Sequence, residues 1–450
     1  MSQITSQETV SVDDLSQGMT APGKVNHFLE GYFRHTDIDR IPEKLMFIIA
    51  CADSREDMEV KFGLNYGEAL FYRAVGAVVP DPDDEIASLP MKAALEHALK
   101  NPHQVEIALL IPHTHCGAVK AHMTGEGPKA LLTAMSGTTN FSGISGSIMT
   151  PEFKLVSDPD EVMAVLRQEN MNEGVKHAVL RSAERACMDV SRDNLLKYPQ
   201  IKEGLKSGKF KLLTGLDDIA CDNISFQMDG HSEGKNITER FLHRYKNATE
   251  GLYDSENGGR MPELVLNGQH PEALFISGLS GDLGKVFSVR IGDAFVHRHT
   301  FGLIPPPRQD TSQPDPLAAT IALALISGVE TFIHKFHADG TFRNYMDGDL
   351  LPYSSQWLEY CIPDLSQMKN SGASLDQVRL HCMLKSIEHL KLYDGVQAAM
   401  NARKLSVLSL YEDPEKRELF VPDRDKNCFV KVLLPDENPA PQENRAFELA

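Results

Sequence analysis

Long apolar runs, clusters of basic residues and a signal-peptide core are all missing from this chain of 450 residues. No apolar stretch is long enough to cross a bilayer, so a transmembrane helix is not expected. The formal net charge is −18, from 45 Lys and Arg against 63 Asp and Glu, which argues against nucleic acid and anionic membranes as partners. Residues 1–23 are polar and lack the apolar segment that a secretory signal requires.

Cysteine is also scarce, with seven residues in the whole chain. So few cysteines exclude a disulfide framework and predict free thiols in a reducing cytoplasm. A length of 450 residues suits two or three domains, and a hydrophobic content of 42% is sufficient for real cores.

Two short motifs stand out against this background. The first contains Cys51, Asp53 and Arg55, and the second contains His113 and Cys116. Each motif directly follows an apolar run that is typical of a buried parallel strand. Because the carboxyl ends of neighbouring parallel strands meet at one edge of a sheet, we expect the two motifs to lie together.

The residue types in these motifs indicate a metal centre. Two thiolates and one imidazole form the ligand set that zinc takes when it keeps a fourth position open for water. Asp53 is close enough in sequence to Cys51 to reach that water, and Arg55 can hold the aspartate ionised and oriented. The alternative interpretation is a pair of buried structural cysteines beside a surface ion pair.

Residues 24–228 resemble a β-class carbonic anhydrase, on the strength of both motifs and of residues 73–76 between them, where Ala74 replaces the usual Asn. The resemblance implies one Zn²⁺ per chain on Cys51, His113 and Cys116, with Asp53 and Arg55 as the catalytic dyad. It further implies reversible hydration of carbon dioxide to bicarbonate by a zinc-bound hydroxide. His115 and His97 are the candidate proton shuttles.

The chain contains a second, degenerate copy of this segment. Residues 45–55 align with 272–282, residues 71–73 with 288–290, and residues 105–117 with 328–340. The expected fold is therefore α/β: two tandem β-carbonic-anhydrase-like domains, each a mainly parallel sheet flanked by helices, packed face to face as an intramolecular pseudo-dimer. The predicted segments are a polar extension (1–23), a zinc-binding catalytic domain (24–229), a degenerate domain (230–435) and a disordered tail (436–450).

The second copy lacks the metal ligands. In this alignment Gly278 replaces Cys51, and Phe336 and Asp339 replace His113 and Cys116. Four histidines near these positions, His297, His299, His334 and His337, could form a replacement metal site, but they are better interpreted as surface or loop residues.

The degenerate copy does contain two residues that a partner subunit lends to the site in plant-like members of the family. Gln269 precedes its first strand, and Phe287 lies three residues before Arg290. The first copy has Pro42 and Leu70 at those positions. The resemblance thus implies that the second copy completes the substrate pocket of the first with Gln269 and Phe287, although a purely structural role for both is an alternative.

Two other functions remain open. Hydrolases of carbon disulfide or carbonyl sulfide share these ligands and this fold, so the ligand set does not separate the substrates. A non-catalytic, zinc-stabilised scaffold or binding protein is the other alternative, but it would need neither Asp53 nor Arg55. In some relatives the aspartate closes the site by binding zinc itself. The expected partner is a small molecule, and the expected assembly is a homodimer of pseudo-dimers.

Overall fold

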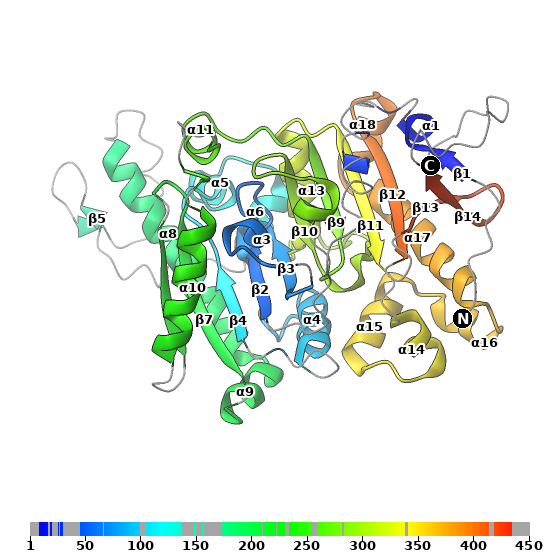
Figure 1. Ribbon diagram of the computed structural model, residues 1–450, viewed down its shortest axis with the longest axis horizontal. Coiled ribbons are helices and arrows are strands. Elements are labelled where there is room, and N and C mark those ends of the chain that lie inside the picture. Colours follow the sequence, from blue (N-terminus) through cyan, green and yellow to red (C-terminus); the bar gives the residue numbers. More distant parts are fainter. Residues whose placement is uncertain are drawn as a thin grey trace.

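A single sheet of 12 strands runs through the computed structural model, in the order β1-β14-β13-β12-β11-β9-β10-β3-β2-β4-β7-β8. The structure describes residues 9–16, 19, 26, 28–29, 46–65, 67–99, 105, 107–136, 148–149, 155–156, 173–208, 210–221, 223–229, 234–249, 251–253, 259–280, 283–337, 341–413 and 418–433. Helices cover both faces of the sheet (Figure 1). No helix in the described ranges combines the length and the apolar character needed to cross a membrane.

The first copy builds one end of this sheet. Its strands are β2 (Met46–Cys51), β3 (Ala69–Ala74), β4 (Ile107–Ile111), β7 (Lys211–Asp218) and β8 (Asn223–Asp229). Its helices are α3 (Met58–Lys61), η1 (Val75–Ala77), α4 (Leu89–Leu99), α5 (Gly117–Thr124), α6 (Lys129–Ser136), α8 (Glu173–Lys197) and α9 (Pro199–Lys206). A separate two-stranded ribbon consists of β5 (Ile148–Met149) and β6 (Leu155–Val156). Strands β3, β2, β4 and β7 are parallel and buried on both faces, as their continuous apolar runs predict.

The second copy builds the other end. Its strands are β9 (Ala273–Ser277), β10 (Ala294–Arg298), β11 (Thr331–His337), β12 (Ser406–Asp413), β13 (Glu418–Asp423) and β14 (Cys428–Leu433). Its helices are α10 (Gly234–Thr249), α11 (Met261–Leu266), α12 (Leu283–Phe287), η4 (Thr300–Gly302), α13 (Pro316–Ile326), α14 (Thr341–Asp347), α15 (Pro352–Cys361), α16 (Leu365–Asn370), α17 (Leu375–Leu392) and α18 (Val396–Asn401). The predicted mainly parallel α/β fold, present twice along the chain, is confirmed.

The two copies meet edge to edge, not face to face as predicted. Strand β10 pairs with β3 in the antiparallel direction, with Arg298 opposite Arg73. Two matching backbone bonds flank this pair: Val296 N donates to Ala52 O over 3.0 Å, and Phe71 N donates to Leu279 O over 2.8 Å. The sheet therefore continues across the boundary through an approximate twofold relation.

Strand registers correct part of the predicted alignment. Ile48 lies beside Phe71 in the first copy, and Phe275 lies beside Val296 in the second, so Arg73 corresponds to Arg298 and not to Arg290. The residues that follow agree, since Gly76 and Phe301, each three positions later, both adopt positive φ.

The strand registers also shift the predicted counterpart of His113 in the second copy by one residue. Leu109 lies beside Ile48, and Ile333 lies beside Phe275, so His337 and not Phe336 corresponds to His113. Gly278 remains the counterpart of Cys51. Asp282, Asp339 and Gly340 lie outside the described residues.

Part of the predicted polar extension belongs to the fold. Strand β1 (Thr9–Ser11) pairs in parallel with β14, and helix α1 (Val12–Ser16) follows it. Val10, Val12 and Leu15 are buried in the core of the second copy. These apolar residues are too few and too closely spaced to be recognised as an element from sequence. The tail predicted to be disordered, 436–450, lies outside the described residues.

Candidate metal centre

Three potential metal ligands converge at the carboxyl ends of adjacent strands. Cys51 is the last residue of β2, His113 follows β4, and Cys116 is the N-cap of α5. All three are buried, and their ligand atoms lie within 4.8 Å of one another. The convergence follows from the parallel pairing of β2 with β4, which brings both strand ends to one edge of the sheet.

The histidine is oriented for metal binding through one nitrogen. His113 Nδ1 lies 2.8 Å from the backbone oxygen of Thr114, so this nitrogen carries the hydrogen. The buried Nε2 has no hydrogen-bond partner among the described residues. A histidine fixed through Nδ1 can offer Nε2 to a metal that displaces its hydrogen, and together with two sulfur atoms it fits zinc with one open position.

The two thiols share a strongly perturbed environment. Burial raises the pKa of Cys51, but the hydrogen bond from Cys116 and the charge of His113 outweigh it and hold the pKa well below its usual value. The hydrogen bond with Cys51, together with burial, raises the pKa of Cys116 well above its usual value. Gly76 N donates to Cys51 Sγ over 3.2 Å. The pair is therefore set to hold one thiolate before metal binding removes the second proton.

Asp53 and Arg55 form a buried bidentate ion pair beside the ligands. Arg55 Nε lies 2.9 Å from Asp53 Oδ1, and its NH2 group lies 2.8 Å from Oδ2. Burial raises the pKa of Asp53, but the Arg55 guanidinium outweighs it and lowers the pKa far below the usual range. Asp53 Oδ2 is 3.7 Å from His113 Nε2. The carboxylate is therefore ionised and fixed beside the three candidate ligands.

A second arginine fixes the loop that carries the aspartate. The buried Arg73 donates from Nε to the backbone oxygen of Cys51 over 3.0 Å and from its NH2 group to that of Asp53 over 2.9 Å. Its counterpart in the second copy, Arg298, pairs instead with Glu59 of the first copy at 2.6 Å. Arg73 thus fixes the loop of the site, whereas Arg298 ties the second copy to α3 of the first.

Gln269 of the second copy reaches into this site. Its Nε2 donates to Asp53 Oδ2 over 2.8 Å. Its Oε1 accepts from the hydroxyl of Ser54 at 2.6 Å and from the backbone nitrogen of Ser54 at 3.2 Å. The two donors fix the direction of the amide, so its nitrogen faces the carboxylate.

Phe287 does not reach the site, and its predicted place there is wrong. It is fully buried at the end of α12, where its ring lies 5.6 Å from that of Phe275 in the core of the second copy.

The corrected register identifies Phe295, three residues before Arg298, as the residue at the expected spacing. Phe295 is fully buried and immediately precedes Val296, which bonds to Ala52. Residues 297–299 are polar, so β10 has too short an apolar run to be recognised as a buried strand from sequence.

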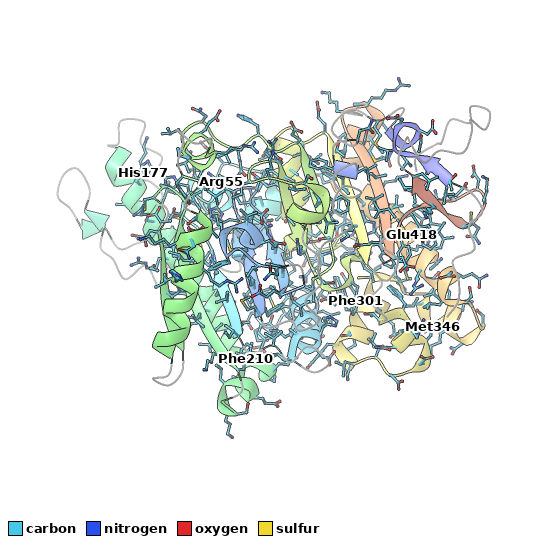
Figure 2. The ribbon with its side chains drawn as sticks, in the orientation of Figure 1. Arg55, His177, Phe210, Phe301, Met346 and Glu418 are labelled. Atoms are coloured by element: carbon cyan, nitrogen blue, oxygen red, sulfur yellow. The ribbon has the colours of Figure 1, made fainter. Side chains whose placement is uncertain are left out.

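The two candidate proton shuttles lie in different places. His115 is half-buried with φ of 56°, its backbone oxygen accepts from Arg55, and its ring centroid is 5.3 Å from that of His177 on α8. Figure 2 labels Arg55 and His177. His97 lies on α4, where its ring contacts Phe301 of the second copy at 6.3 Å. Only His115 is brought next to the metal ligands, and its role in proton transfer stays a prediction.

Sequence reasoning missed two buried acids near the cluster. Glu184 on α8 accepts the backbone N–H of Cys116 at 3.0 Å, and Glu56 binds Lys61 at 2.6 Å. Burial raises the pKa of both carboxyls, to about 7 in each case. The sequence signal for Glu184 was an acidic residue on an otherwise apolar face of a helix. The signal for Glu56 was its position directly after Arg55 of the first motif.

Three of the four histidines expected at the surface of the second copy are buried, and the side chain of the fourth, His337, lies outside the described residues. His297, His299 and His334 are all buried, and each has a hydrogen-bond partner at Nδ1. Among the described residues, no group of three potential ligands other than Cys51, His113 and Cys116 comes together.

Comparisons with known proteins agree with this geometry. The carbonic anhydrase family matches residues 46–224. Beta carbonic anhydrase 5, chloroplastic, of Arabidopsis thaliana is 26% identical over 204 residues, which cover 45% of this chain and 60% of that protein. Beta carbonic anhydrase 3 of the same plant is 24% identical over 189 residues, which cover 42% of this chain and 66% of that protein. The chain thus spans less than two thirds of the length of either relative.

Solved structures of β-carbonic anhydrases also align with the chain. The β-carbonic anhydrase CcaA is 20% identical with a TM-score of 0.38, covering 44% of this chain and 94% of that one. One of two tetrameric β-carbonic anhydrases from the ascomycete Sordaria macrospora is 17% identical with a TM-score of 0.32, covering 48% and 96%. Residues 46–224 match the carbonic anhydrase family and contain both motifs and the strands that carry them, so this part of the chain is β-class carbonic-anhydrase-like.

Proposed function

We propose that the protein catalyses the zinc-dependent, reversible hydration of carbon dioxide to bicarbonate. The observation that carries this proposal is the Asp53–Arg55 pair, which lies buried beside the three ligands and binds Gln269 of the second copy. A zinc site that only stabilises a fold has no need of an oriented, ionised carboxylate at its open position.

Cys51, His113 and Cys116 would hold the metal. Zinc bound by such a set lowers the pKa of a coordinated water from near 16 to about 7. The described residues supply the rest of the chemistry by orienting the attacking oxygen and the substrate.

Asp53 is the orienting group. Arg55 occupies both carboxylate oxygens and keeps them ionised, so Oδ2 can only accept a hydrogen. Accepting it from the attacking hydroxyl leaves an oxygen lone pair directed at the carbon atom of carbon dioxide.

The second copy would complete the site, so the working unit is a pseudo-dimer with one zinc per chain. Gln269 binds Asp53 Oδ2 and has an amide group that can also hydrogen-bond a substrate oxygen. We assign the aromatic role predicted for Phe287 to Phe295, since that residue has the required spacing from Arg298. The cytoplasmic location and the homodimer of chains stay predictions.

Stopped-flow measurement of carbon dioxide hydration by the zinc-loaded full chain tests the proposal. We expect turnover that Asp53→Asn removes while zinc stays bound. The same protein should be offered carbon disulfide and carbonyl sulfide under identical conditions. Faster hydrolysis of either compound than hydration of carbon dioxide would assign the protein to those hydrolases, and no turnover of any of the three would favour a scaffold.

A further inference from the structure

A pocket lies where the two copies meet, on a part of the molecule that the proposed reaction does not use. Its walls come from α4 and β3 of the first copy and from β10, α13 and α15 of the second; α4 and α15 pack together there (Figure 1). Three aromatic residues, Tyr72, Trp357 and Tyr360, and five prolines line it. Prolines fix their own backbone, so this wall is largely preformed.

The floor of the pocket contains two histidines with their Nδ1 atoms already occupied. His297 Nδ1 lies 3.0 Å from the hydroxyl of Thr320, which donates its own hydrogen to Pro316 O. His299 Nδ1 lies 3.3 Å from Thr300 O. A carbonyl, or a hydroxyl whose hydrogen is in use, can only accept, so both histidines carry their hydrogen on Nδ1 and present a bare Nε2.

Both rings are neutral at pH 7. Burial lowers the pKa of His297 well below its usual value and that of His299 to about 4. The two ring centroids are 5.1 Å apart, and each residue is 3% exposed. The Nε2 of His299 has no hydrogen-bond partner among the described residues. The pocket lining therefore contains one acceptor, His299 Nε2, that no donor in the described part of the protein satisfies.

The charged groups at the pocket are already paired. Arg308 binds Asp84 at 3.3 Å and donates to Pro314 O, and Asp315 caps α13 by accepting from Ala318 N. None of these charges is free for a ligand ion. The cavity volume is about 40 Å³, which holds only a few heavy atoms, and Ile86, 42% exposed, lies at the rim.

We propose that this pocket binds a small, uncharged, planar molecule that donates an N–H or O–H hydrogen to His299 Nε2 while its ring packs against the aromatic and proline walls. A planar apolar face suits Trp357 and the prolines, and the donor suits the unsatisfied nitrogen. Anions are disfavoured because the unsatisfied nitrogen of His299 is an acceptor. This inference goes beyond the proposed hydration activity and does not depend on it.

Tryptophan fluorescence tests the proposal directly, because Trp357 is the single tryptophan of the chain. Pyrazole is the probe: it is planar, neutral at pH 7.5 and carries one N–H donor. N-methylpyrazole is the matched control, since it keeps the ring and lacks the donor. We expect a saturable change in emission with pyrazole and at least tenfold weaker binding of N-methylpyrazole.

Variants of the full chain give a second, independent measurement. His299→Gln should weaken pyrazole at least tenfold, whereas His389→Gln, on α17 outside the pocket, should leave its affinity unchanged. Circular dichroism of each variant checks that it is folded. The proposal is overturned if pyrazole leaves the emission of the native protein unchanged, or if both probes bind it equally. The second comparison needs no variant, so misfolding of His299→Gln cannot rescue the proposal.

Discussion

Gln269 Nε2 and Asp53 Oδ2 are 2.8 Å apart although the two residues are 216 positions apart in the chain. The amide belongs to the second copy, which lacks the two ligand cysteines. The carboxylate belongs to the first copy, which contains them. The site is therefore composite, and changes in the second copy should alter chemistry in the first.

Replacement of Gln269 by Ala should lower turnover by about 10- to 100-fold, the typical cost of losing one oriented hydrogen-bond donor in an active site. The side chain is half-buried at the surface of the site and supports no core, so zinc content and melting temperature should stay nearly unchanged. Gln397→Ala, on the exposed face of α18, is the control. Full activity of Gln269→Ala would reduce the second copy to a structural support.

Asp53→Asn should retain zinc but lose on the order of 10²-fold or more in hydration rate. The amide matches the carboxylate in shape, but it lacks the charge that Arg55 holds and can donate where the carboxylate must accept. Asp81→Asn, which changes a surface pair with Lys197, controls for the loss of one charge. Near-normal turnover of Asp53→Asn would contradict the assigned role.

Cys116→Ser should lose most of the bound metal, because an alcohol is a much weaker zinc ligand than a thiolate. Metal analysis of the native chain should give one equivalent of zinc, and the exposed Cys221→Ser should match it. Two tightly held equivalents in the native chain would show that the second copy also binds metal.

Lys61→Met should destabilise the protein by about 3–5 kcal/mol, the usual result of leaving buried charges without their partner. Lys61 is fully buried between Glu56 and Asp217, and Tyr245 on α10 donates to the same aspartate. Lys197→Met, in a half-exposed pair with Asp81, should change stability by less than about 1 kcal/mol. Urea unfolding of both variants measures the difference.

The stability of the native protein should fall between pH 7 and pH 5 in part because of His334. Burial lowers its folded pKa to about 4, below the usual value of 6.5. The unfolded chain therefore binds more protons in this interval, so stability rises with pH and is lost as pH falls from 6.5 towards 4. At pH 5 the loss from this one residue is about 2 kcal/mol.

Urea unfolding of His334→Gln at pH 7 and pH 5 checks this value, with the exposed His243→Gln as control. The His334 variant should be less stable at pH 7 but should lose about 2 kcal/mol less than the native protein on going to pH 5. An equal pH dependence in all three proteins would show that His334 is not buried in its neutral form.

The metal centre could be predicted because its ligands lie close in sequence to the strands that position them. Cys51 and Cys116 sit within a few residues of apolar strands, and parallel pairing of those strands brings them together without any further contact. Gln269 could be placed for the same reason, since its distance from β9 in the sequence matches the spacing known for the family.

The middle part of the second copy could not be predicted in the same way. Residues 287–290 imitate the apolar-then-arginine pattern of β3, yet Arg290 has a side chain that is 70% exposed, and the true strand ends at Arg298. That strand contains buried polar groups that are paired by distant residues, Thr320 and Glu59. Polar side chains that are buried because distant residues pair with them give a strand no alternation of apolar and polar residues. Such a strand cannot be recognised from its own sequence.

The joined sheet has a consequence for behaviour at low concentration. When a site borrows a side chain from a separate subunit, dilution below the dissociation constant removes that side chain and the activity with it. Here Gln269 is covalently tied to Asp53 and is delivered by strands that are continuous with those of the first copy, so its local concentration is fixed by the chain itself. The turnover per chain should therefore not depend on how many chains are present.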